Sequence, residues 1–269
     1  MSELAMAYLT LGDIDPFELV EAAARGGFKS TAIRLTGHAP GDNWGFDPRE
    51  PNQRHRMRTL ADDAGIALVN ASTYRFVPGV SVEDYDPVLE TCAELGIGTI
   101  TANSFAGERA EVAALMQAVA ERAALLGIRI AIEFIPVSKV RTAEDALALA
   151  LATGSDNVGI LVDALHLWRS GGSVRTIEDL PPDRLFAVQL CDGPANAPQP
   201  DQLAMEMRKG RLLPGAGEFD LRGLMQALPA GIEVEIEAPN ARFDSLTPAD
   251  KARLVHNAAR SFLETLEAS

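Results

Sequence analysis

Short apolar segments recur along the chain, and segments with the periodicity of amphipathic helices lie between them. The intervening stretches, such as DPFELVEAAARGG and EVAALMQAVAERAALLG, place apolar residues near the helical spacing and carry a glycine close to their ends. Strands that alternate with helices are typical of a parallel sheet. The apolar segments number eight, at 4–10, 31–37, 66–72, 98–104, 128–134, 158–163, 185–192 and 232–239.

Eight such units in a chain of 269 residues predict an α/β fold, a single (β/α)8 TIM barrel over residues 1–269, because barrels of this kind occupy about 250 residues. No GxGxxG motif follows the first apolar segment, which disfavours an open dinucleotide-binding sheet. No stretch reads as a linker between two domains. The longest irregular segment is 192–218, and a loop of that length in a compact domain is usually functional or mobile.

Polar side chains stand near the ends of four predicted strands. In a barrel of this type the active site lies at the C-terminal mouth, so these side chains are expected to converge there. Three carboxylates that met without a cation would repel one another, whereas Mg²⁺ and Mn²⁺ prefer oxygen ligands. A single carboxylate at a strand end is more often a helix cap or a surface ion pair, so the prediction of a metal site depends on the whole set. Its members are Glu133, Asp163, Gln189 and Glu235.

The eighth apolar segment contains three glutamates, and its sequence does not decide which of them is the ligand. IEVEIE carries Glu233, Glu235 and Glu237 on one face of the strand, because strand side chains alternate in direction. Glu235 is the predicted ligand, uncertain by one step in either direction, and Glu233 is a candidate partner for Arg129 in the lower barrel. The same alternation predicts mostly small or apolar residues beneath the other three ligands, namely Arg129, Ala131, Gly159, Leu161, Leu185 and Ala187.

His166 follows the sixth strand by three residues, and an imidazole there could act as a general acid or base near neutral pH. A lone histidine is more often a hydrogen-bonded structural group. Four cations also lie near predicted strand ends or in mouth loops, and each taken singly would be a solvated surface residue: Arg75, Lys139, Arg208 and Arg211. RLLPGAGEFD places Arg211 before a Pro-Gly turn that could hold it over the mouth, where it would suit a carboxylate, phosphate or enolate.

Composition excludes several classes of protein. The formal net charge of −14 opposes binding to the phosphate backbone of nucleic acid. Cys92 and Cys191 are too few and too far apart for a disulfide framework or a Cys-rich zinc site, which favours a reducing compartment. The N-terminus lacks the pattern of a signal peptide, and no apolar run approaches the roughly 20 residues that span a bilayer. The expectation is a cytoplasmic protein without a membrane or nucleic-acid partner; a homo-oligomer is compatible with the sequence.

On these residues the chain resembles, over nearly its whole length, the xylose-isomerase-like barrel superfamily, which includes sugar (phosphate) isomerases and epimerases, inosose dehydratases, 3-dehydroshikimate dehydratases and endonuclease IV. In many members Glu, Asp, His and Glu on strands five to eight hold a metal, with a histidine after the Asp and an R…PGxGE-D loop. The resemblance therefore implies the four predicted ligands named above, together with His166, Arg211 and PGAGEFD. Gln189 replaces the usual histidine, and the resulting all-oxygen site favours Mn²⁺, Mg²⁺ or Co²⁺ over Zn²⁺.

Three groups within the superfamily sharpen this reading. Bacterial 3-dehydroshikimate dehydratases are similar in having glutamine in an FxVQ context and a loop arginine before PGxGE, and the resemblance makes Arg75 a contact for a substrate carboxylate. Ketose 3-epimerases carry a second catalytic glutamate where Lys139 stands here, which counts against their two-carboxylate proton exchange. Endonuclease IV needs a His-rich zinc site, and four histidines with a charge of −14 argue against it.

The resulting hypothesis is a metal-dependent enzyme that forms an enolate on a small polyhydroxylated keto substrate. His166 and Lys139 are the candidate catalytic residues, and Arg75, Arg208 and Arg211 the candidate substrate contacts. Loss of a β-hydroxyl from the enolate gives dehydration, which is favoured, and reprotonation gives isomerisation or epimerisation. Two rivals are a barrel that binds a sugar-like ligand without turnover and a metal-free isomerase.

Overall fold

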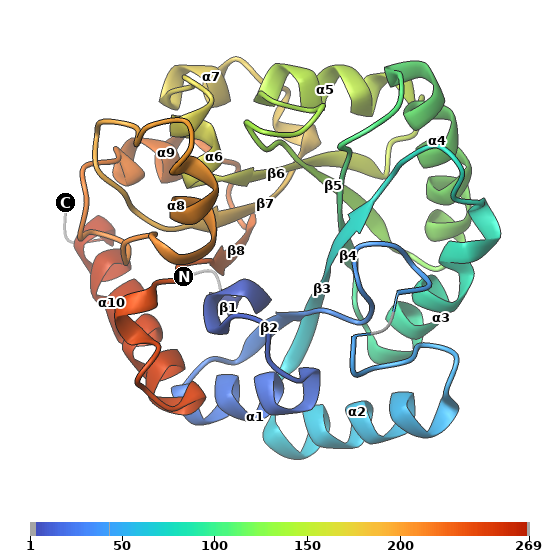
Figure 1. Cartoon of the computed structure of the whole chain (residues 1–269), viewed down its shortest axis with the longest axis horizontal. Helices are drawn as coiled ribbons and strands as arrows, with labels where there is room; N and C mark the ends of the chain where they lie inside the picture. The colour runs from blue at the N-terminus through green and yellow to red at the C-terminus, as the bar shows by residue number, and fades with distance from the viewer. Residues whose placement is uncertain (1–3, 43, 268–269) are drawn as a thin grey trace.

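The computed structural model describes residues 4–42 and 44–267 and shows the closed barrel that the sequence predicts (Figure 1). Each strand pairs in parallel with the next along the chain, and the eighth pairs with the first, so the sheet closes as a (β/α)8 TIM barrel. The strands are β1 (Leu4–Met6), β2 (Ser30–Ile33), β3 (Ala67–Arg75), β4 (Thr99–Asn103), β5 (Arg129–Glu133), β6 (Val158–Asp163), β7 (Leu185–Leu190) and β8 (Glu233–Ile236).

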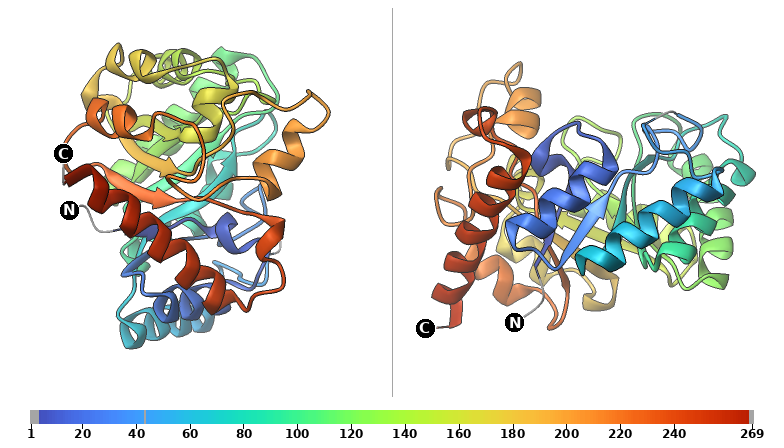
Figure 2. Two further views of the ribbon diagram at one scale, coloured as in Figure 1. Left: turned by 90° about the vertical axis from the view of Figure 1, so that its left-hand side faces the viewer. Right: turned by 90° about the horizontal axis from the view of Figure 1, so that it is seen from below.

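Helices surround the barrel, and several short ones lie in its loops (Figures 1 and 2). The α-helices are α1 (Pro16–Gly26), α2 (Pro51–Ala64), α3 (Asp86–Leu95), α4 (Arg109–Leu125), α5 (Ala143–Ala152), α6 (Ala164–Arg169), α7 (Val174–Glu178), α8 (Leu203–Lys209), α9 (Leu221–Ala227) and α10 (Pro248–Glu267). Short 3-10 helices are η1 (Tyr8–Leu11), η2 (Val82–Tyr85), η3 (Pro182–Arg184) and η4 (Ala241–Phe243). Within the described ranges, no helix has the length and apolarity needed to cross a bilayer.

Helix α1 shows how local sequence sets these elements. The Asp15 side chain accepts hydrogen bonds from the backbone N–H groups of Phe17 and Glu18, and a proline occupies the first turn, so the helix begins where its free N–H groups find an acceptor. Its last residue, Gly26, lies against Ala252 of α10: a Cβ at Gly26 would come within 2.5 Å of the Ala252 Cβ. Helices α1 and α10 therefore pack side by side and close the ring (Figure 1).

An apolar cluster fills the barrel interior beneath the mouth. Ala131, Leu161 and Ala187 belong to it, as strand alternation predicts. The sequence also predicted Leu185 in this layer, but Phe186 takes that place and Leu185 belongs to the larger core cluster. The cause is a shift in register between β6 and β7 at Ile160 and Leu161, which an alternating pattern in one strand does not reveal. We call Ala131, Leu161, Phe186 and Ala187 the apolar floor.

The bottom of the barrel is closed around Phe186. The Arg129 guanidinium lies 4.9 Å from the centre of the Phe186 ring and 3.8 Å from a carboxylate oxygen of Glu233, the partner that the sequence suggested. Gly159 allows this close approach, because a Cβ there would lie 2.6 Å from both the ring and the Arg184 carbonyl oxygen.

The long segment after β7 is more ordered than its sequence indicated, because it contains α8 and two short bridges. The Asp192 carboxylate accepts hydrogen bonds from the backbone N–H groups of Gly193, Gly215 and Phe219, at 2.9, 3.0 and 3.0 Å. These bonds gather the turn of PGAGEFD at the end of β7. The residues before that turn are thereby held on the mouth side of the barrel.

Candidate active site

A cavity of about 110 Å³ lies at the C-terminal mouth, on the face of the barrel that Figure 1 presents to the viewer. Its walls come from the loops after most of the strands and from α8. The lining residues are Tyr8, Leu9, His38, Thr73, Arg75, Asn103, Phe105, Glu133, Ile135, His166, Met207, Arg208, Arg211 and Glu237.

Glu133, Asp163 and His166 meet at this cavity, which Glu133 and His166 line and beside which Asp163 is buried. Each offers one potential ligand atom, and these atoms lie within 4.8 Å of one another. The His166 Nε2 atom is 3.6 Å from the Glu133 Oε1 atom, and Asn103 forms a side-chain hydrogen bond with Glu133. Asp163 also caps α6, because its Oδ1 atom accepts a hydrogen bond from the His166 backbone N–H at 2.9 Å. The cap explains how an apolar strand that ends in Asp163 delivers His166 to the mouth.

Arg211 bridges two carboxylates at the mouth. Its Nη1 atom lies 2.5 Å from the Asp163 Oδ2 atom and its Nη2 atom 2.9 Å from the Glu237 Oε2 atom. The guanidinium is also held by the Met207 carbonyl oxygen, which accepts from Nε at 2.9 Å, and its side chain is only 2% exposed. Arg211 therefore lies at the mouth as predicted, with its charge directed at the carboxylates.

The residues predicted as ligands on β7 and β8 lie deeper than expected. Glu235 is fully buried, accepts hydrogen bonds from Asn70 Nδ2 at 2.7 Å and Gln189 Nε2 at 2.8 Å, and does not line the mouth cavity. Glu237, the next residue on the same face, lines it instead. The glutamate that reaches the mouth from β8 is therefore Glu237, two residues further along the chain than the predicted Glu235. The Oε1 atom of Gln189 is buried and has no hydrogen-bond partner.

Burial shifts the ionisation of these groups strongly. It raises the pKa of Glu133 well above the usual range, with Glu237 and Asp163 adding repulsion. Burial also raises the pKa of Glu237 to about 8, although Arg211 opposes the shift. For Asp163 burial is outweighed by Arg211 and His166, so its pKa lies below the usual range. Burial lowers the pKa of His166 to about 4, which leaves a neutral imidazole at neutral pH.

The donor set fits a divalent cation. Glu133, Asp163 and Glu237 bring three carboxylates against the single positive charge of Arg211, so the cluster is neutral only when protons or a further cation bind. Gln189, beside Asp163 in the sheet register, adds a buried carbonyl oxygen without a partner. Oxygen donors of this kind suit Mg²⁺ or Mn²⁺.

Binding of Mn²⁺ is expected to strengthen as the pH rises from about 6 to 8, by up to about tenfold per pH unit for each proton that the ion displaces. The reason is that Glu237, with a pKa raised to about 8 by burial, is protonated below that pH. In the metal-free protein the same raised pKa lowers folding stability as the pH climbs from about 4.5 toward 8, because over this range the unfolded state has released the Glu237 proton that the folded state still holds. Calorimetric titration of Mn²⁺ at several pH values checks the first effect, and an affinity that is constant over this range would contradict it.

Arg75 and His38 also line the mouth cavity. The Arg75 guanidinium lies 4.7 Å from the centre of the Phe105 ring, and its buried Nε atom has no hydrogen-bond partner. His38 also lines the cavity, and its Nδ1 atom lacks a partner. Burial, with Arg34 and Arg75 nearby, lowers the pKa of His38 to about 4. The cavity therefore brings the positive charge of Arg75, from the end of β3, together with the carboxyl groups of Glu133 and Glu237, from β5 and the end of β8.

Sequence reasoning missed four polar residues of this cavity: Tyr8, His38, Thr73 and Asn103. Asn103 is the last residue of β4, so the rule that selected Glu133 also selects it. Tyr8 begins the short helix η1 after β1, and His38 lies in the loop after β2, where no periodic pattern marks either residue.

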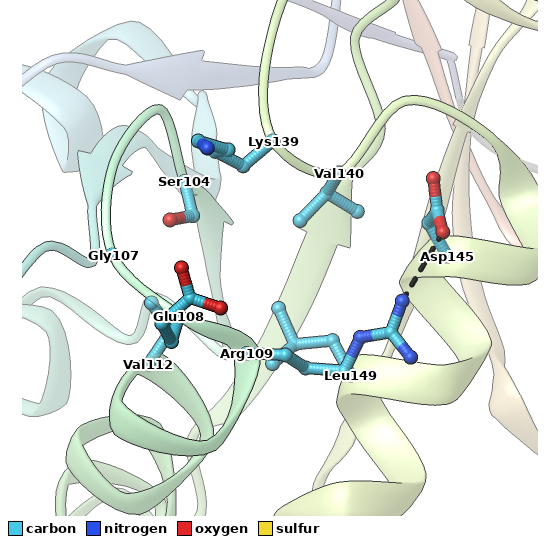
Figure 3. Close-up of a pocket in the computed structure, with 9 residues that line it drawn as sticks. All are labelled: Ser104, Gly107, Glu108, Arg109, Val112, Lys139, Val140, Asp145 and Leu149. Carbon is cyan, nitrogen blue, oxygen red and sulfur yellow. Dashed lines mark hydrogen bonds and ion pairs between the residues drawn. The ribbon is translucent and has the colours of Figure 1, made fainter.

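Of the remaining predicted cations, Lys139 lies outside the mouth cavity and Arg208 lines it. Lys139 lines a neighbouring cavity of about 160 Å³ between the starts of α4 and α5, together with Ser104, Glu108 and the ion pair of Arg109 and Asp145 (Figure 3). The structure does not bring Lys139 to His166 in the mouth cavity, which removes the geometric basis for a shared catalytic role. Arg208 does line the mouth cavity, from the exposed helix α8.

The chain belongs to the xylose isomerase-like TIM barrel family, whose sequence profile matches residues 20–264. A 3-dehydroshikimate dehydratase of Pseudomonas aeruginosa is 30% identical over 191 residues, which cover 65% of this chain and 29% of that protein. An inosose isomerase of Bacillus velezensis is 26% identical over 197 residues, covering 68% of this chain and 66% of the relative. Among solved structures, the IolI protein with a bound zinc atom superposes with a TM-score of 0.80 at 17% identity, covering 99% of both chains.

Proposed function

We propose that the chain is a metal-dependent dehydratase for a small cyclic keto acid of the 3-dehydroshikimate type. The observation that carries the proposal is the polarity of the mouth cavity. Arg75 lines this small cavity from the end of β3, and Glu133 and His166 line it from the end of β5 and from α6. A ligand with a carboxylate at one end and a ketone at the other matches that polarity.

Glu133, Asp163 and Glu237, with Gln189, are the residues that would hold one divalent ion, Mn²⁺, Mg²⁺ or Co²⁺. This set keeps three of the ligands expected from the sequence and replaces Glu235 by Glu237. When bound, such an ion polarises the ketone and so favours loss of the neighbouring proton.

His166 is the proposed base. Its imidazole is neutral because burial lowers its pKa to about 4, and it lines the cavity together with Glu133. It takes the proton from the carbon beside the ketone, and the electrons of that C–H bond form the enolate. The enolate then expels the hydroxyl on the next carbon, which leaves as water with the proton that His166 returns.

Other side chains orient the substrate and exclude water. Arg75 binds the carboxylate, and Phe105 and Ile135 provide apolar wall. Arg208 covers the cavity from α8. Arg211 keeps Asp163 ionised and holds the Asp163 and Glu237 side chains in place.

Isomerisation or epimerisation of a polyhydroxylated ketone is the second candidate, and it begins with the same removal of a proton. A specific feature favours it: His38 is a second imidazole in the cavity, with an unpartnered Nδ1 atom that could return a proton from another direction. The name of the Bacillus velezensis relative supports this candidate, and that of the Pseudomonas aeruginosa relative supports dehydration.

Turnover of 3-dehydroshikimate in the presence of Mn²⁺ tests the proposal. We expect aromatic absorbance to appear, with activity lost in EDTA and restored by Mn²⁺. Arg75→Met is expected to raise KM by about 10-fold or more, as for loss of a charge-assisted hydrogen bond. Inososes and keto-sugars assayed in deuterated water form the second arm, in which deuterium uptake without loss of water would select isomerisation. Protein that binds no stoichiometric metal and turns over no substrate would support a binding barrel and overturn both candidates.

A further inference from the structure

Helix α8 covers part of the mouth with little apolar contact, since Met207 alone of its residues packs, partly buried, against the main hydrophobic core. It contributes Met207 and Arg208 to the mouth cavity, yet none of its seven residues is fully buried. Figures 1 and 2 show α8 on the mouth side of the barrel, apart from the outer ring of helices. A short helix in this position needs a specific tether, because seven residues are too few for an isolated helix to be stable in water.

The tether is an ion pair with α6. The Nε and Nη2 atoms of Arg169 donate to the two carboxylate oxygens of Glu206, at 2.8 and 2.7 Å, in a two-pronged arrangement. Their side chains are only 1% and 11% exposed, so water screens the pair little. Arg169 also donates to the Pro194 carbonyl oxygen at 2.9 Å and lies 5.1 Å from the centre of the Phe219 ring.

The two helices that this ion pair joins, α6 and α8, both contribute residues to the candidate active site. Arg169 ends α6, the helix that also carries His166. On α8, the Met207 carbonyl oxygen accepts a hydrogen bond from Arg211, the arginine that bridges Asp163 and Glu237. A displacement of α8 would therefore move the cover of the cavity and also free one side of Arg211.

We infer that Arg169 is a positioning residue that holds α8 across the mouth through Glu206, so that Met207 and Arg208 contact the bound ligand. The inference rests on the proposed function for its kinetic consequence. Its structural consequence, the fixation of α8, is independent of any substrate.

Limited proteolysis with trypsin tests the fixation directly, because α8 contains Arg208 and Lys209. In Arg169→Met and in the nearly isosteric Glu206→Gln, cleavage at α8 is expected to accelerate by about 10-fold or more relative to wild type, as expected when a hydrogen-bonded charge pair is lost. The double exchange Arg169→Glu/Glu206→Arg is expected to restore part of the protection. Arg175→Met is the matched control, because Arg175 pairs with Glu178 and Asp179 on the exposed surface of α7.

Kinetics provide the second measurement. With a substrate that the protein turns over, Arg169→Lys is expected to raise KM by about 10-fold and change kcat little, since lysine keeps the charge but loses the two-pronged bond. Cleavage at α8 no faster than in Arg175→Met, or acceleration spread equally over all tryptic sites, would overturn the inference. Absence of turnover with every substrate would count against the proposed function and leave the proteolysis result to decide on Arg169.

Discussion

Replacing His166 with glutamine is expected to lower kcat by about 10²- to 10⁴-fold, the usual contribution of a general base. Glutamine fills similar space but cannot take a proton, whereas the imidazole is neutral and available because burial lowers its pKa to about 4. The fold should persist, since the bond that caps α6 uses the backbone N–H of His166 and not its ring. Steady-state kinetics with the substrate identified in the screen, together with circular dichroism, measure both effects.

His55→Gln is the matched control, because His55 lies exposed on α2, away from the mouth. It should leave kcat unchanged within error. A His166→Gln variant that kept more than about a tenth of wild-type turnover would exclude His166 as the base.

Replacing Arg211 with methionine is expected to reduce the free energy of unfolding of the metal-free protein by about 3–5 kcal/mol, the cost of leaving one partner of a buried ion pair without the other. Asp163 and Glu237 would then face each other with no positive charge between them. Mn²⁺ should recover much of this loss, because an ion bound by the same carboxylates supplies the missing charge. Urea denaturation with EDTA and with Mn²⁺ compares the two states.

The control for this variant is Arg253→Met, which removes an ion pair with Asp250 on the exposed side of α10. Its effect should stay within about 0.5 kcal/mol, as for most surface substitutions. If Arg211→Met and Arg253→Met lowered the free energy of unfolding equally in EDTA, the buried ion pairs of Arg211 would not stabilise the fold as predicted.

The sequence predicted the barrel because each of the eight strands has its own apolar segment, bounded by helical patterns. Details that depend on how two strands pair were not predictable in this way. Alternation within β7 placed Leu185 in the interior, whereas the shift in register against β6 brings Phe186 there. Such a shift is a property of the pair of strands and leaves no mark in either one alone.

The site was predictable to a similar extent. Glu133 and Asp163 end their strands, so their position at the mouth follows from the fold, and His166 follows from the helix that Asp163 caps. On β8 three glutamates share one face, and only the stagger between neighbouring strands decides that Glu237 stands at the mouth and Glu235 beneath it. The metal and catalytic roles of these residues stay predictions.

The apolar floor lies below Glu133 and Asp163, which are both buried, and the cavity that Glu133 lines is at the mouth. Any ion held beneath an organic ligand must then bind before that ligand and depart after it. Under the proposed function the ion therefore loads before the organic ligand and leaves after it, and an excess of that ligand should slow the exchange of the ion.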